Sequence, residues 1–220
     1  IAYLDSRGFM YDGVTTIASI YIMDLNTGEE ISILGDVAFS AASTMKLPIL
    51  IDYFRNLRID PTQDEAWLMA NSLLCSNNAS SNLLMQIIGG GDDIFAGLAR
   101  VTQTMQYLGA RNTYIAAPFV EGITGQRLGS IEAPPTNPNS LHSTNPDRFN
   151  QTTAEDMGTL LNLLYDCAQY GSGLITAYPD GEFTQRECQR MINLIAANDL
   201  ERLLQGGIPP DITIAHKNGW

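Results

Sequence analysis

Residues 39–48 read Phe-Ser-Ala-Ala-Ser-Thr-Met-Lys-Leu-Pro, and this stretch says more about the fold than any other. It leads into a helix that we predict over about 43–58, where the proline is tolerated because it lies near the helix start. Ser43 and Lys46 stand three residues apart, so their side chains share one face of that helix. A serine at a helix start is also a common cap, so the pair acquires a chemical meaning only from its surroundings.

Two further polar motifs stand later in the chain. Residues 76–78, Ser-Asn-Asn, lie between two predicted helices, a position that turns side chains into a shared cleft. Residues 217–219, Lys-Asn-Gly, follow a strand that we predict over 211–216. Each motif alone is explained by helix capping or by a solvated strand end. The three together, each in the setting that its chemistry requires, indicate a hydrolase that attacks an amide with an activated serine.

The activation of Ser43 requires a base, because a serine hydroxyl is a weak nucleophile until a neighbour takes its proton. Lys46 is the nearest candidate, but its amine must be neutral at the working pH. Lowering the pKa of a lysine from about 10.4 to about 7 costs on the order of 4–5 kcal/mol. Burial and a second ammonium can supply this, and Lys217 is the only other lysine in the sequence. We therefore expect the two lysines to lie together.

Composition narrows the class of protein. The 220 residues, 45% hydrophobic and 16% charged, are typical of one globular domain or of two lobes that share a site. The net charge of −12 argues against a nucleic acid or an anionic membrane as partner. No apolar run reaches the roughly 18–20 residues that span a bilayer.

The three cysteines predict neither a metal site nor a disulfide framework, because their spacing is irregular and their number is odd. Cys167 and Cys188 each fall on the apolar face of a predicted helix, so we expect two buried thiols. We expect Cys75 to pack against its neighbours as well. No metal and no cofactor are predicted.

The remaining pattern is a strand hairpin followed by many helices. We expect the hairpin to consist of strands over 14–23 and 31–34. Helices are predicted over 60–74, 79–88 and 92–108. The proline-rich stretch 116–150 has no sustained periodicity and predicts a long functional loop. Three later helices begin at the capping residues Thr153, Thr184 and Asn198. We predict an α/β (α+β) fold, with an antiparallel sheet flanked by helices and a helical lobe.

These motifs and their flanking residues resemble the penicillin-recognising serine hydrolases, and most closely the class A β-lactamases. The resemblance covers about 14–115 and 151–220. It implies a single β-lactamase-like domain over 1–220, with an irregular loop over 116–150 and incomplete at both ends. In the family, two further strands and a C-terminal helix follow the third motif, so a missing segment or a second chain would complete the sheet. The family also implies a location outside the cytoplasm.

The resemblance implies a role for each residue of the motifs. Ser43 would be the acylated nucleophile, Lys46 its general base and Ser76 the proton shuttle. The backbone N–H groups of Ser43 and Trp220 would form the oxyanion hole. The positions that would bind the substrate are Asn78, Lys217, Asn218, Gly219 and Trp220.

Departures from the class A pattern change the expected activity. Asn77 stands where an Asp is usual, and Asn218 stands where a Thr or Ser is usual. The stretch between the first two motifs is shorter, which should open the cleft on one side. The Glu-x-x-x-Asn pattern that carries the deacylating glutamate is absent, and alignment puts Phe119 at its place. The nearest substitute base is Glu121, followed by Glu132.

Three functions remain open on this basis. The first is a β-lactamase that opens a β-lactam amide through an acyl-enzyme on Ser43. The second is a D-Ala-D-Ala peptidase, which Asn77 and the open cleft favour. The third is a sensor that a β-lactam acylates once, which the absent glutamate pattern favours because deacylation would then be slow. The expected partner is a small-molecule β-lactam or a D-Ala-D-Ala peptide.

Overall fold

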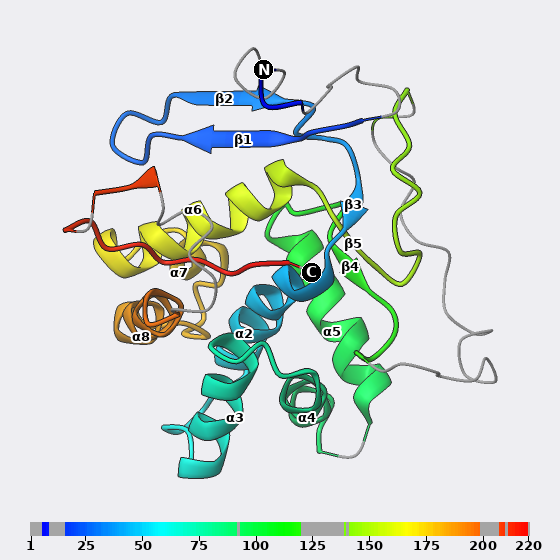
Figure 1. The fold of residues 1–220 in the computed structure, drawn as a ribbon. Coiled ribbons are helices and arrows are strands. Elements are labelled where there is room, and N and C mark those ends of the chain that lie inside the picture. Colours follow the sequence, from blue (N-terminus) through cyan, green and yellow to red (C-terminus); the bar gives the residue numbers. More distant parts are fainter. Residues whose placement is uncertain are drawn as a thin grey trace.

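The computed structural model describes residues 6–8, 16–91, 93–119, 139, 141–198, 207–209 and 211–219. Figure 1 shows their arrangement, with a strand hairpin on one side and most helices gathered beneath it. In chain order the elements are β1 (Ile20–Met23), β2 (Glu30–Ile33), β3 (Phe39–Ser40), η1 (Ala42–Met45), α2 (Lys46–Arg55), α3 (Gln63–Leu73), α4 (Asn78–Ile88), α5 (Ile94–Tyr107), β4 (Tyr114–Ile115), β5 (Asn150–Thr152), α6 (Ala154–Tyr170), α7 (Leu174–Ala177) and α8 (Gln185–Ala196).

The strands form two small antiparallel sheets. β1 and β2 make the expected hairpin, in which Ile20 lies opposite Ile33. The inner face of the hairpin lies over α6, where the ring of Tyr21 packs against Gly158. β5 pairs with both β3 and β4 in the second sheet. This second sheet brings the end of the predicted loop beside the strand that leads into η1.

α2 is the central helix, and it contacts α3, α4, α5 and α8. Its residues from Lys46 to Phe54 are all buried, as is typical of a helix surrounded by other helices. The predicted helix over 43–58 therefore begins as a 3₁₀ turn and ends at Arg55. The helical core includes residues of α3, α4, α5, α6 and α8 as well. This packing holds the first turn of α2 in the interior.

Polar caps explain where several helices begin. α3 begins after Thr62, whose side chain forms a capping box with Glu65, so its first residue lies three positions after the predicted start at residue 60. Thr184 and Glu187 form the predicted capping box of α8. Thr153 caps α6 by accepting a hydrogen bond from the backbone of Asp156. The helix predicted after Asn198 lies outside the described residues.

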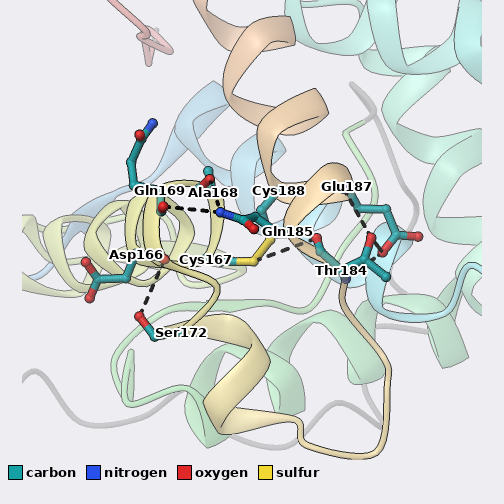
Figure 2. The surroundings of a disulfide bond; sticks show 9 residues. All are labelled: Asp166, Cys167, Ala168, Gln169, Ser172, Thr184, Gln185, Glu187 and Cys188. Carbon is teal, nitrogen blue, oxygen red and sulfur yellow. Dashed lines mark hydrogen bonds between the residues drawn. A yellow bond between two sulfur atoms is a disulfide. The ribbon is translucent and has the colours of Figure 1, made fainter.

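The expectation of two buried thiols was wrong, because Cys167 and Cys188 form a disulfide. Both side chains are buried, and the apolar faces of α6 and α8 pack together, which leaves the Cα atoms 5.8 Å apart. That separation suits a disulfide. Figure 2 shows the bond at the end of α6 and the start of α8, where Gln185 also donates to two carbonyls of α6. Cys75 is a free, exposed cysteine and does not pack as expected.

The strand predicted over 211–216 is also absent from the structure. Residues 211–219 cross the helices as irregular backbone and end beside the first turn of α2 (Figure 1). A strand requires a neighbour for its backbone groups, and none of the described strands pairs with this segment. Among the helices of the described ranges, none has the length and apolarity for crossing a bilayer.

Candidate active site

Ser43 lies in the short η1 turn that passes directly into α2. The preceding residue, Ala42, has a positive φ of 46°, a conformation that is costly for any residue with a side chain. Asn150 of β5 supports this turn, since its side-chain amide donates to the carbonyl of Ala42 at 3.1 Å. The backbone carbonyl of Asn150 also accepts from the backbone N–H of Ala41 at 2.9 Å. The second sheet thereby holds the nucleophile candidate at the buried end of α2.

The side chain of Lys46 is completely buried and ends among oxygen atoms. Its Nζ lies 2.9 Å from Oγ of Ser43 and 3.1 Å from Oγ of Ser76. It also lies 2.6 Å from the carbonyl oxygen of Ser76 and 2.8 Å from Oδ1 of Asn78. An ammonium has three hydrogens for these four acceptors. In the neutral form the amine has a lone pair, which can accept the hydroxyl proton of Ser43.

In the second motif, one residue caps a helix and the other two contact Lys46. Asn77 caps α4, because its side chain accepts from the backbone N–H of Ser80 at 2.8 Å. Ser76, just before it, has a positive φ of 52°. That strained backbone turns both its hydroxyl and its carbonyl toward Lys46. Helix capping thus explains Asn77, whereas its two neighbours face the lysine.

Lys217 joins the same cluster from the other side. Its Nζ donates to Oγ of Ser76 at 3.1 Å and to the carbonyl oxygen of Asn218 at 2.9 Å. The hydroxyl of Ser76 therefore contacts both lysines. His216 points away from the two lysines, and its Nε2 lies 3.0 Å from the backbone carbonyl oxygen of Asn198.

The two lysines share a site with no described carboxylate within ion-pair distance, since both ion pairs found among the described residues involve arginines. Burial, and next the nearby ammonium of Lys217, lower the pKa of Lys46 to about 8. Burial also lowers the pKa of Lys217. A larger part of the Lys46 population is therefore neutral near pH 8 than for an ordinary lysine. The expectation that the two lysines lie together is confirmed.

Phe119 covers the remaining side of Lys46. The centre of its ring lies 5.0 Å from Nζ of the lysine. Asn82 holds its backbone by two hydrogen bonds, accepting from the N–H at 2.9 Å and donating to the carbonyl at 3.2 Å. Asn78 and Asn82 are four residues apart, so one face of α4 positions both the lysine and the ring. The side of Lys46 that Phe119 covers is therefore apolar.

The third motif packs against η1 and the preceding Ala41, which we call the nucleophile turn because it carries Ser43. A Cβ atom at Gly219 would lie 2.9 Å from Cγ2 of Thr44 and 3.1 Å from the carbonyl oxygen of Ala41. A side chain at this position would therefore require the turn to move. The predicted residues Glu121, Glu132 and Trp220 lie outside the described residues. Within the described ranges, no cluster of His, Cys, Asp and Glu suits a metal ion.

The structure thus brings Ser43, Lys46, Ser76, Asn78 and Lys217 together, and it adds residues that sequence reasoning missed. Asn82 had a signal, because it lies one helical turn after Asn78. Asn150 had none, since its partner is the backbone of a turn more than a hundred residues earlier. The contact of Phe119 with Lys46 likewise depends on the folded loop.

Comparisons with known proteins identify the family and the fold. A family model described as the beta-lactamase enzyme family matches residues 10–65 and 61–220. No curated protein sequence matches. Solved structures show the same fold at low identity, and they bear out the predicted fold class.

Three of these solved structures illustrate the likeness. PBP-A has 20% identity over 92% of this chain and 71% of that chain, with a TM-score of 0.63. A mutant of PBP-A was solved as an acyl-enzyme complex with penicillin G. An ancestral class A β-lactamase of Gram-negative bacteria has 18% identity over 99% and 78% of the two chains, with a TM-score of 0.63. A β-lactamase from Streptosporangium roseum has 16% identity over 91% and 72%, with a TM-score of 0.62.

Proposed function

Since the chain belongs to the beta-lactamase enzyme family, we propose that it is a serine hydrolase that opens a β-lactam amide through an acyl-enzyme on Ser43. One observation carries this proposal. The amine of Lys46 lies within hydrogen-bond distance of the hydroxyls of both Ser43 and Ser76. One base thereby contacts both the nucleophile and the proton carrier, which is the geometry that acyl transfer requires.

Acylation follows from these contacts. Neutral Lys46 accepts the proton of Ser43, and Oγ of the serine bonds to the carbonyl carbon of the substrate. When the carbon–nitrogen bond breaks, the hydroxyl of Ser76 gives its proton to the leaving nitrogen and regains one from Lys46. Ser43 lies where η1 passes into α2, and the positive end of that helix favours the developing oxyanion.

The charge of the site favours an anionic substrate. Lys217 has no carboxylate partner in the described part of the chain, although the whole chain carries a net charge of −12. A substrate carboxylate would supply the missing counter-charge. Both a penicillin-type β-lactam and a D-Ala-D-Ala peptide carry such a group. In addition to Lys217, the proposed substrate-binding positions are Asn78, Asn218 and Gly219.

The proposed acyl-enzyme is long-lived. Hydrolysis of the ester requires a base that activates water, and the ring of Phe119 occupies the side of Lys46 where a carboxylate would act. Glu121 is the candidate base that the sequence leaves for this step. A slowly deacylating site also suits the two alternatives, a D-Ala-D-Ala peptidase and a β-lactam sensor. A mutant of PBP-A, a protein of the same fold, was solved as an acyl-enzyme complex with penicillin G, which supports a site that holds such an adduct.

One experiment separates these functions. The protein is mixed with a chromogenic cephalosporin, with penicillin G and with a D-Ala-D-Ala peptide, and both turnover and adduct mass are followed. Turnover of the cephalosporin identifies a β-lactamase, turnover of the peptide a peptidase, and a stable single adduct a sensor. The Ser43→Ala variant is the control. An adduct that persists in this variant, or no reaction of the wild type with any of the three, would refute the proposal.

Exchanging Phe119 tests the slow deacylation separately. We expect Phe119→Glu to release the penicilloyl adduct at least about tenfold faster, because a carboxylate beside Lys46 can activate water. Phe119→Leu keeps an apolar side chain at the same place and serves as the matched control. Equal release from the two variants would show that the ring does not account for a slow step.

The disulfide and the family together support a location outside the cytoplasm, since disulfides persist in oxidising compartments. We further propose one β-lactamase-like domain, because α2, α3, α4, α5, α6 and α8 contribute to one core. Mass spectrometry of protein alkylated before and after reduction tests the first point. Release of two additional thiols only after reduction is the expected result.

A further inference from the structure

The segment that carries Lys217 is attached to α8 and not to a sheet. Among the described residues, one backbone hydrogen bond joins residues 211–219 to another element, from the N–H of His216 to the carbonyl of Ile195 at 3.2 Å. This bond fixes the backbone just before Lys217. Side-chain hydrogen bonds add to it in placing the ammonium of Lys217.

Asn198 supplies such contacts from just beyond the end of α8. Its side chain is 2% exposed, and its Nδ2 donates to the carbonyl of Leu73 at 3.1 Å and to that of His216 at 3.5 Å. The backbone carbonyl oxygen of Asn198 lies 3.0 Å from Nε2 of His216. A carbonyl can only accept, so the ring nitrogen of His216 is the donor. Asn198 and His216 are thus linked in both directions.

These partners lie next to two site residues in the chain. Leu73 is the last residue of α3, three residues before Ser76, and His216 immediately precedes Lys217. Asn198 therefore ties together the two segments whose side chains meet at 3.1 Å, between Nζ of Lys217 and Oγ of Ser76. The link is buried, so water does not replace these hydrogen bonds readily when the amide is lost.

We propose that Asn198 is a positioning residue that holds Lys217 against Ser76 and so keeps a second ammonium beside Lys46. Asn198 touches none of the reacting groups itself. Its effect on acylation rests on the proposed function, whereas its effect on the two lysines does not. Loss of the amide allows Lys217 to move away, which weakens the repulsion that Lys46 experiences.

The two lysines allow a direct test, because a sample labelled at the lysine ε-carbon contains only Lys46 and Lys217. Both are titrated by NMR in the wild type, in Asn198→Ala and in Asn193→Ala, which changes an exposed residue of α8. In Asn198→Ala the titration midpoint of Lys46 should rise by at least about half a pH unit. Asn193→Ala should leave it unchanged. An unchanged midpoint in a folded Asn198→Ala protein would overturn the proposal.

A nearly isosteric variant covers the case in which the alanine variant does not fold. In Asn198→Asp a carboxylate faces two carbonyl oxygens, but the protonated acid can donate to one of them. We expect penicillin acylation, relative to wild type at the same pH, to fall about tenfold at about pH 8 and to recover toward wild type at about pH 5.5. Thermal melting is measured at both values. A ratio that stays near one at both values contradicts the positioning role.

Adduct formation and the lysine titration test the two proposals independently. If the wild type forms no penicilloyl adduct, the proposed function is wrong, and the lysine titration still decides the role of Asn198. If the wild type is acylated but the titration midpoint of Lys46 is the same in Asn198→Ala as in the wild type, the positioning role is wrong and the proposed function stands.

Discussion

On one side of the site, Ser43 and Lys46 stand one turn apart at the start of a buried helix, and α4 packs directly on that helix. On the other side, Lys217 belongs to an irregular segment that reaches the same cluster through its contacts with α8 and with the nucleophile turn. We call the first side, formed by α2 and α4, the helical wall; helix geometry and a shared core determine its shape. We call the second side, formed by residues 211–219, the irregular wall; a few side-chain hydrogen bonds to distant parts of the chain hold it in place.

The helical wall holds the reacting groups, Ser43 and Lys46, whereas the irregular wall holds Lys217, which affects the pKa of Lys46. The distance between Ser43 and Lys46 follows from helix geometry once the helix has formed. The pKa of Lys46, by contrast, depends on burial and on a second ammonium that another segment delivers. The helical wall should therefore govern whether acylation occurs, and the irregular wall should govern the pH at which it occurs.

The largest effect is expected from Lys46→Met, which removes the base from the helical wall. Acylation by penicillin G should fall by about 10³-fold or more, because Ser43 then has no neighbouring proton acceptor. Methionine is apolar and of similar length, so the buried site keeps its packing. The rate of adduct formation by mass spectrometry measures the loss. A variant within tenfold of wild type would remove Lys46 from the mechanism.

The pH profile tests the same base without a mutation. Acylation requires neutral Lys46, and its pKa is lowered to about 8. Below that value most of the lysine is protonated, so the rate should rise about tenfold per pH unit and level off above about pH 8. The measurement is the adduct-formation rate across this range. A rate that rises steadily to about pH 10 would show an ordinary lysine and break the contrast between the walls.

Lys217→Met should have a smaller effect, because it alters the irregular wall. Acylation at neutral pH should fall by about 10- to 100-fold, since the substrate loses its counter-charge and Lys46 loses the repulsion that favours its neutral form. The acid limb of the pH profile should move to higher pH. Lys217→Arg, which retains the charge, is the matched control and should leave that limb close to its wild-type position.

The smallest effect on chemistry is expected from removing the disulfide. The double variant Cys167→Ala, Cys188→Ala should lose about 3 kcal/mol of unfolding free energy, because the bond closes a loop with a sequence separation of 21. The melting temperature should fall by about 10 °C. Acylation at a temperature where the variant is folded should stay within about threefold of wild type. A larger loss would show that α6 and α8 contribute directly to the site.

Several features of the molecule were predictable from local patterns. The hairpin, the positions of α2 to α6 and the capping box of α8 follow from periodicity and capping residues. The first two motifs were placed correctly at the ends of helices. Errors arose where a structure depends on a partner elsewhere in the chain. The predicted strand over 211–216 has no neighbour among the described strands, and the two predicted thiols face each other and form a bond.

Three properties could be predicted from the order of residues alone: the succession of the three motifs, the helix that sets Ser43 one turn from Lys46, and the family that these residues indicate. These properties depend on spacing along the chain, which the backbone converts directly into position. The contact of Lys217 with Ser76, the position of Phe119 over Lys46 and the link that Asn198 makes between two segments became visible only in the folded chain. Such contacts link residues more than seventy positions apart, and packing of the whole core, not local preference, selects them.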